Sequence, residues 1–242
     1  MARIFSKNKE DLKPDINQES VLNFFEERAK KAKIVGYNQA VIYQDKDPEL
    51  AKKRDLIEKE TLLPKLQLSS KESLLDIGCG TGRWAETLQN LVSYYHGIDA
   101  SEGLLEIAKS RFNNLNFTCV KANEISMDTL KEKELFDRVC CFGVLIYLND
   151  IEVKQTLQAI SKIIKKNGLF ILREPIATKD RLTIKDHFST DMEQIYNAIY
   201  RTQKEILQNI EDFELLESND LFDNNLNNRV ETKQKYFIFR KI

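Results

Sequence analysis

Beyond residue 72 the chain alternates between short apolar runs and amphipathic stretches. The apolar runs cover residues 73–78, 94–99, 117–122, 136–143 and 168–175. Between them, apolar residues recur at helical spacing over 82–91, 102–112 and 150–166. Short strands separated by helices predict right-handed βαβ units, and therefore a doubly wound, mostly parallel sheet.

The segments on either side of this pattern are predicted to be helical, apart from two late strands. Residues 19–32 place apolar side chains along one helical face, and a second helix is expected to start at Asp47 and Pro48 and to stop at Pro64. Residues 176–212 end in a further helical pattern, before strands over 213–218 and 233–241. The apolar stripe of that last helix is expected to consist of Met192, Ile195, Tyr196, Ile199 and Tyr200.

Charge and composition narrow the class of protein. The 242 residues carry 37 Lys and Arg against 38 Asp and Glu, so no large field attracts nucleic acid or an anionic membrane. The N-terminus is polar, no apolar run reaches the roughly 18 residues of a membrane span, and the four cysteines form no C-x-x-C pair. We expect a cytoplasmic protein with reduced thiols. No His, Asp and Glu cluster has metal-ligand spacing, so no metal is expected.

A glycine-rich loop, DIGCGTG at residues 76–82, follows the first predicted strand of the sheet. Its G-x-G-x-G spacing is one residue shorter than the dinucleotide fingerprint, and it lacks the Lys-Ser/Thr of a phosphate-binding loop. Asp99 ends the next strand, where a carboxylate can accept both hydroxyls of a ribose. With Asp76, it would repel a pyrophosphate and favour a ligand with cationic groups.

Three motifs, DIGCGTG, GIDAS and FDRVCCFGVLIYL, make residues 73–175 resemble a class I S-adenosylmethionine-dependent methyltransferase. The resemblance implies S-adenosylmethionine as cofactor, with Asp76 near its amino group, Asp99 on the ribose and Leu104 on the adenine. Arg54 is a candidate partner of the cofactor carboxylate, although a solvated surface role is an open alternative, and Tyr43 is a candidate lid residue. The implied cofactor-binding residues are Tyr43, Arg54, Asp76, Gly78, Gly80, Asp99, Ala100, Leu104, Asn123 and Phe142.

This family predicts an α/β architecture with a seven-stranded, mostly parallel sheet whose last strand is reversed. The N-terminal helices and a helical cover after strand five would pack over one end. We expect a polar tail (1–18) and one domain (19–242), divided into an N-terminal helical lid (19–72), a cofactor-binding core (73–175), an acceptor-site cover (176–212) and closing strands (213–242).

The acceptor is expected to bind near the cover. The strand-four end lacks the [DNS]-P-P-[YFW] motif of nucleobase-amine methylases. His187 is a candidate general base for a hydroxyl acceptor, or alternatively a polar loop residue, and Tyr147 would shape the pocket as a weak base. The residues that could bind an anionic acceptor are Arg173, Lys185, Tyr196, Tyr200 and Arg201, unless they only pack a helix on the domain.

We therefore expect methyl transfer to oxygen or nitrogen of a small polar metabolite, for example a sugar or sugar nucleotide. Neither nucleic acid nor a membrane is an expected partner, and the sequence leaves the oligomeric state open. The alternatives are an RNA or protein methyltransferase with a basic surface stripe, a catalytically silent scaffold that keeps the cofactor, and a nucleotide-sensing or NAD-dependent protein.

Overall fold

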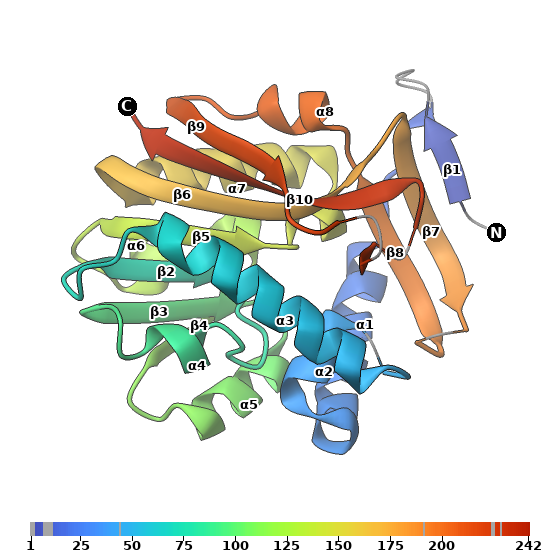
Figure 1. Ribbon diagram of the computed structural model, residues 1–242, viewed down its shortest axis with the longest axis horizontal. Helices are drawn as coiled ribbons and strands as arrows, with labels where there is room; N and C mark the ends of the chain where they lie inside the picture. Colours follow the sequence, from blue (N-terminus) through green and yellow to red (C-terminus); the bar gives the residue numbers. More distant parts are fainter. Residues whose placement is uncertain (1–2, 7–11, 44, 191, 224–225, 228) are drawn as a thin grey trace.

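The computed structural model describes residues 3–6, 12–43, 45–190, 192–223, 226–227 and 229–242. Its central sheet has seven strands in the order β4-β3-β2-β5-β6-β10-β9 (Figure 1). The first five are parallel, and β10 runs antiparallel to both of its neighbours. The predicted seven-stranded sheet with a reversed last strand is confirmed. Its strands are β2 (Ser73–Ile77), β3 (Tyr94–Asp99), β4 (Asn116–Cys119), β5 (Phe136–Phe142), β6 (Ile164–Ala177), β9 (Phe213–Asp220) and β10 (Thr232–Lys241).

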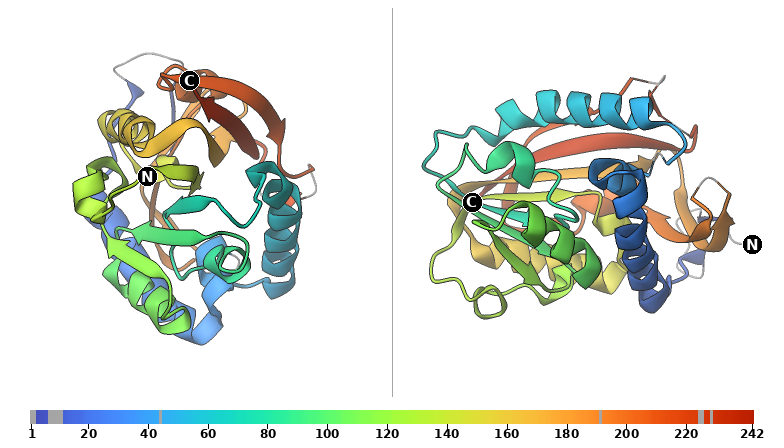
Figure 2. Two further views of the ribbon diagram at one scale, coloured as in Figure 1. Left: turned by 90° about the vertical axis from the view of Figure 1, so that its left-hand side faces the viewer. Right: turned by 90° about the horizontal axis from the view of Figure 1, so that it is seen from below.

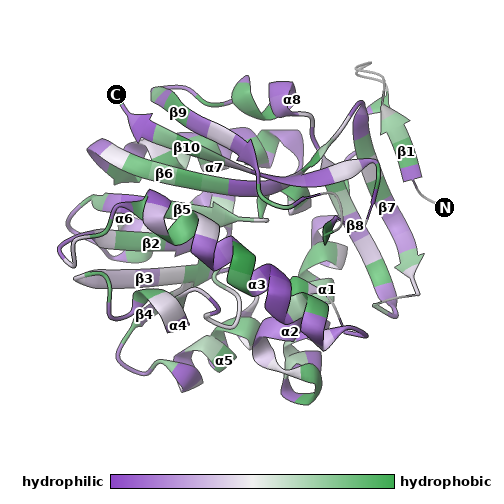
Figure 3. Ribbon diagram, in the orientation of Figure 1, coloured by the Kyte–Doolittle hydropathy of each residue, from purple (hydrophilic) through white to green (hydrophobic). Residues whose placement is uncertain are grey.

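Helices cover both faces of this sheet because successive strand residues point to opposite sides. Leu75 and Cys141 face the cluster that contains α7 (Asp150–Ile163), whereas Leu74 and Cys140 face the cluster that contains α3 (Pro48–Leu62). Figure 2 shows α3 and α7 on opposite sides of the strands, and Figure 3 shows how apolar the central strands are. The other helices are α1 (Gln18–Val35), α2 (Tyr37–Ile42), α4 (Ala85–Leu88), α5 (Glu102–Arg111), α6 (Met127–Leu130) and α8 (Gln203–Leu207).

The start of α3 follows the sequence prediction. The Asp47 side chain accepts the Leu50 amide and Pro48 occupies the first turn, as its missing N–H allows. The α-helix ends at Leu62, and a 3₁₀ turn, η2 (Leu63–Leu66), carries Pro64. Across the described residues no helix combines the length and the apolar content that a membrane crossing needs.

The predicted helical cover after strand five is wrong in its secondary structure. Residues 181–200 form two strands, β7 (Arg181–Ser189) and β8 (Gln194–Tyr200), and only α8 is helical in the remainder of 176–212. The β7–β8 pair builds a separate three-stranded sheet with β1 (Arg3–Ser6). A short apolar run fits both the helical and the strand period, and here backbone pairing with a distant strand decides between them.

Part of the predicted polar tail is therefore structured. Arg3–Ser6 pair with β7, and Ile16 is buried in the cluster under the second sheet. Residues 1–2 and 7–11 of the predicted tail lie outside the described residues.

The second sheet and the N-terminal helices meet beyond the carboxyl ends of the central strands (Figure 1). Val21 and Phe24 of α1 pack in one apolar cluster with Leu182 and Ile199 of the hairpin. Lys31 Nζ donates to the Met192 carbonyl over 3.0 Å, which ties α1 to the start of β8. The N-terminal helices α1 and α2 and the β7–β8 hairpin therefore cover this end of the central sheet together, and we call this cover the roof.

Candidate functional site

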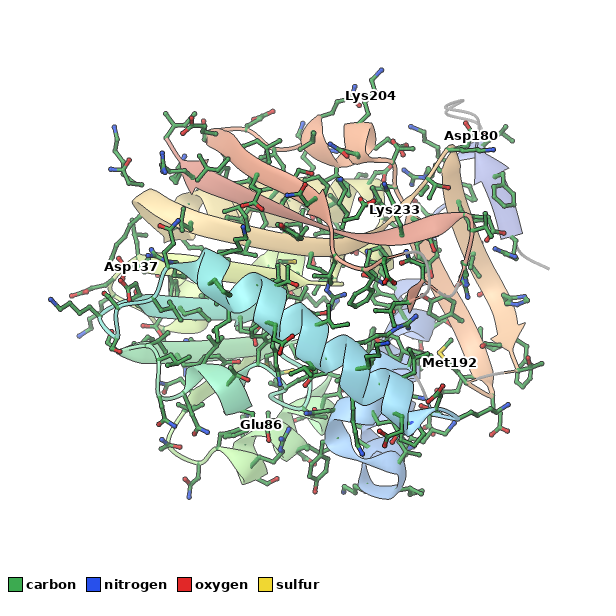
Figure 4. The ribbon with its side chains drawn as sticks, viewed as in Figure 1. Glu86, Asp137, Asp180, Met192, Lys204 and Lys233 are labelled. Atoms are coloured by element: carbon green, nitrogen blue, oxygen red, sulfur yellow. The ribbon has the colours of Figure 1, made fainter. Side chains whose placement is uncertain are left out.

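A cavity of about 600 Å³ lies under this roof, at the carboxyl ends of β2, β3, β5 and β6. Lys233 and Met192, labelled in Figure 4, line it from β10 and from the turn before β8. Open α/β sheets bind ligands at this edge. The structure brings most of the predicted site residues to the cavity: Tyr43, Arg54, Asp76, Gly78, Gly80, Asp99, Ala100, Leu104, Asn123, Phe142, Tyr147, Arg173, Tyr196 and Tyr200.

The glycine loop forms one wall of the cavity. Gly78 and Gly80 adopt φ angles of 73° and 54°, which favour glycine. The amides of Gly78 and Cys79 both donate to the Ile98 carbonyl, at 2.8 and 2.9 Å. A Cβ atom on Gly78 would lie 2.3 Å from Val144 Cγ2, so the loop can lie this close to the β5 turn only with glycine there.

Two carboxylates flank the loop. The Asp99 oxygens accept the Gly80 and Ser101 amides, each at 2.9 Å, and Asp76 Oδ2 accepts the Tyr95 hydroxyl at 2.6 Å. Burial raises the pKa of each aspartate to about 6. Their hydrogen bonds fix both side chains on the cavity wall, where a ligand with hydroxyl or ammonium groups would meet them.

A buried ionic cluster forms the floor beside α3. Glu58 contacts Arg83, accepts the Trp84 indole N–H at 3.1 Å and lies 3.0 Å from Arg173 Nη2. Burial opposes ionisation of Glu58, but Arg173 and Arg83 outweigh burial and lower its pKa to about 2. The sequence analysis missed Glu58 and Arg83. The one available signal was the position of Arg83 directly after the glycine loop.

Arg54 lies near this cluster and lines the same cavity. Its Nη2 donates to the Leu226 carbonyl, and its guanidinium carbon lies 5.8 Å from the centre of the Phe222 ring. It thereby contacts the segment between β9 and β10.

Aromatic side chains enclose the opposite end of the cavity. The Tyr147 ring centre lies 4.9 Å from that of Phe25 and 6.3 Å from that of Tyr196, both nearly perpendicular to it. The Tyr196 and Tyr200 hydroxyls are 2.9 Å apart. The buried Tyr147 hydroxyl has no hydrogen-bond partner of good geometry among the described residues. This end can therefore desolvate a ligand and still offer it hydroxyl groups.

Two cations at the aromatic end escaped the sequence analysis. Arg229 Nη1 donates to the Tyr200 hydroxyl at 3.2 Å, and Lys233 lines the cavity while it pairs with Asp220 at 2.9 Å. Arg229 lies just before β10, and Lys233 lies in β10. No local pattern in the sequence links Arg229 to Tyr200, because the two residues come together only when β10 pairs with β6.

Three predicted acceptor-site or catalytic residues do not line the cavity. Arg201 is 2% exposed and donates to the Leu145 and Leu148 carbonyls, at 2.8 and 2.7 Å. It therefore holds the turn that carries Tyr147, including the 3₁₀ helix η4 (Leu145–Tyr147), and does not reach a ligand. Lys185 and His187 lie on β7 and do not line the cavity themselves, although His187 is paired with Tyr196, which does.

Replacement of His187 by alanine is expected to leave turnover within about twofold of the wild type, because the imidazole does not line the cavity. Steady-state methyl transfer with labelled cofactor measures this. A loss of orders of magnitude in kcat, with cofactor affinity retained, would restore His187 as the general base.

Comparisons with known proteins agree with the fold and the glycine loop. Residues 74–168 match the family described as methyltransferase domain. Ubiquinone biosynthesis O-methyltransferase of Pelagibacter ubique is 32% identical over 122 residues, 47% of this chain and 49% of that protein. The chain spans about half the length of the first curated relatives that it matches.

Solved structures confirm the fold. The phosphoethanolamine N-methyltransferase 1 of Haemonchus contortus, in complex with phosphoethanolamine and S-adenosylhomocysteine, superposes with a TM-score of 0.70 at 16% identity. That match covers 94% of this chain and 50% of the other. The N-methyltransferase NodS of Bradyrhizobium japonicum, in complex with S-adenosylhomocysteine, gives a TM-score of 0.61 at 15% identity, over 92% and 98% of the two chains.

Proposed function

We propose that the protein transfers the methyl group of S-adenosylmethionine to a small polar acceptor. The premise is that residues 74–168 form a class I methyltransferase domain. One observation carries the proposal. The same cavity joins the glycine loop and its two aspartates to an aromatic end that no nucleotide-binding role requires. A protein that only sensed a nucleotide would have no use for this second half.

The residues present fit the cofactor. Gly78 and Gly80 line the cavity without side chains of their own, and Asp99 presents oxygen atoms suited to ribose hydroxyls. Asp76 suits the ammonium group, and Leu104 and Asn123 suit the adenine face and edge. Arg83, Arg173 and Arg54 would share the cofactor carboxylate, since each lines the cavity near Glu58.

When bound, S-adenosylmethionine supplies a methyl group already activated on a sulfonium. The work left to the protein is alignment and exclusion of water. Phe142 ends β5 beside the loop, Gly143 follows it and Tyr147 lies on η4, so one continuous turn contacts both halves of the cavity. Arg201 and Glu174 hold this turn through its carbonyls and amides, respectively.

The acceptor that we propose is a small metabolite with an anionic group, in the class that includes sugar phosphates and sugar nucleotides. Arg229, which donates to Tyr200 and lines the cavity, supports an anion at the aromatic end. The roof formed by α1, Tyr43 and the hairpin favours a molecule that fits inside the cavity over an RNA or protein chain. The near balance of charge on the whole chain supports the same choice.

Cofactor affinity is expected to fall between pH 7 and pH 5 by about tenfold for each aspartate that must be charged, and so by about 100-fold for two. The pKa of Asp76 and Asp99 is about 6, and their charged forms suit a ligand with cationic and hydroxyl groups. For the protein without cofactor, the stability against unfolding depends on pH in the opposite sense. Its stability gains from the raised pKa values below pH 3.8 and loses that gain as the pH rises through 6. Calorimetric titration across this range would give a flat profile if neither aspartate contacts the cofactor.

Calorimetry with S-adenosylmethionine and with NAD tests the proposed function directly. We expect binding of the former and none of the latter. A folded protein that does not bind S-adenosylmethionine would contradict the proposal. Binding without methyl transfer to any acceptor in a metabolite extract would favour the silent scaffold.

A further inference from the structure

We infer that the acceptor is an amine and that the cavity catalyses N-methylation. This inference rests on the proposed function and adds the reacting atom. Two features of the cavity carry it: aromatic rings enclose one end, and among the described lining residues there is no histidine and each buried carboxylate already has a hydrogen-bond or ion-pair partner.

The aromatic walls suit an organic cation. Tyr147 and Tyr196 are 5% and 4% exposed, and Phe25 contacts the Tyr147 ring at 4.9 Å between ring centres. Tyr43 completes this wall from the lid, with its ring 5.7 Å from that of Phe24. The faces of aromatic rings attract alkylated ammonium groups, and more strongly where water is excluded.

A hydroxyl acceptor would need a base to take its proton. Burial raises the pKa of Tyr147 and Tyr196 well above the usual range, so both phenols keep their protons. The carboxylates among the described lining residues are exposed at the rim, paired with arginine, or bound by amide or phenol groups; they are Glu19, Asp55, Glu58, Asp76, Asp99 and Glu152. His187 and Glu174 do not line the cavity.

An amine that has given its ammonium proton to solvent before transfer needs no base in the transfer step itself. The nitrogen lone pair forms the N–C bond to the methyl carbon while the C–S bond breaks and its electron pair returns to sulfur. The positive charge therefore passes from sulfur to nitrogen inside the aromatic enclosure, and an N–H proton leaves to solvent afterwards. The Tyr147 hydroxyl interacts with those of Tyr43 and Tyr196 and has lone-pair capacity left to accept an N–H hydrogen bond of the neutral amine, which orients the amine lone pair.

The far end of the aromatic enclosure indicates which second group the acceptor carries. Tyr196 bonds Tyr200 at 2.9 Å, and Arg229 bonds Tyr200 at 3.2 Å, so a cation lies behind the aromatic rings. Such a site fits a short amine that carries a phosphate, sulfonate or carboxylate.

Matched amine and hydroxyl compounds test the reacting atom. The pairs are 2-aminoethyl phosphate with 2-hydroxyethyl phosphate, taurine with isethionate, and β-alanine with 3-hydroxypropionate, each assayed with methyl-labelled S-adenosylmethionine. We expect label in at least one amine at a rate about 100-fold or more above its hydroxyl partner, as the missing base implies. Faster methylation of a hydroxyl compound than of its amine partner would overturn the inference.

Binding supplies a second, independent test. With the protein saturated by S-adenosylhomocysteine, choline phosphate is expected to bind about tenfold more tightly than 3,3-dimethylbutyl phosphate, which has the same shape without the charge. Y196F should keep this preference, and Y196L should lose it. Equal affinities of the two probes, or no binding of either, would contradict the amine inference. Failure of S-adenosylhomocysteine itself to bind would instead contradict the proposed function.

Discussion

Asp99→Ala is expected to weaken S-adenosylmethionine binding at least about 100-fold, because each hydrogen bond to a charged group contributes about 1.5–3 kcal/mol and the ribose would use two. The loss has a second source. Asp99 also accepts the Gly80 and Ser101 amides, so its removal releases the glycine loop that contacts the rest of the cofactor. Isothermal titration calorimetry measures the dissociation constant.

Two variants separate these contributions. Asp99→Asn keeps an acceptor oxygen and the shape of the side chain, and we expect a smaller loss, about tenfold. Glu102→Ala removes a nearby exposed carboxylate from the first turn of α5 and should leave the affinity within about twofold. Equal affinity of Asp99→Ala and wild type would place the cofactor elsewhere in the cavity.

Glu58→Ala is expected to lower the free energy of unfolding by about 3 kcal/mol, because Arg173 loses its carboxylate partner and Arg83 keeps only Asp55. Urea denaturation followed by circular dichroism measures the change. The pKa of Glu58 is lowered from 4.5 to about 2, so its stabilisation is fully present above pH 4.5 and disappears as the pH falls through 2. The difference between variant and wild type should shrink over that interval.

Glu60 provides the matched control for this prediction. It is exposed on the same helix two residues later, and Glu60→Ala should change the free energy of unfolding by less than about 0.5 kcal/mol. If Glu58→Ala were as mild as Glu60→Ala, the two arginines would have to find other partners or reach water.

The cofactor half of the site could be read from the sequence because its geometry is local. Gly78 and Gly80 lie at the end of one strand, and Asp99 lies at the end of the strand that follows. Parallel strands bring their carboxyl ends to one edge, so the order of elements along the chain already places these residues together. No comparable rule predicts the cluster around Glu58, because its contacts depend on how α3 crosses the sheet.

The acceptor half could be predicted only in part. Tyr196 and Tyr200 line the cavity but lie on a strand where a helix was predicted, since their spacing of four fits one face of a helix and also one face of a strand. Lys185 and His187 look reactive in the sequence, yet neither residue lines the cavity, although Ser189 of the same strand does. Arg229 was missed because its contact with Tyr200 exists only after β10 has joined the sheet.

The roof also constrains the order of folding during synthesis. β1 pairs with β7 across about 180 residues of chain, and Val21 and Phe24 of α1 share their apolar cluster with late residues such as Leu182 and Ile199. A ribosome makes the N-terminal helices long before these partners, so their apolar faces stay uncovered while the core of parallel strands is completed. Contacts between such distant segments form late and slowly. The nascent chain therefore has an aggregation-sensitive interval that ends when the β7–β8 hairpin emerges.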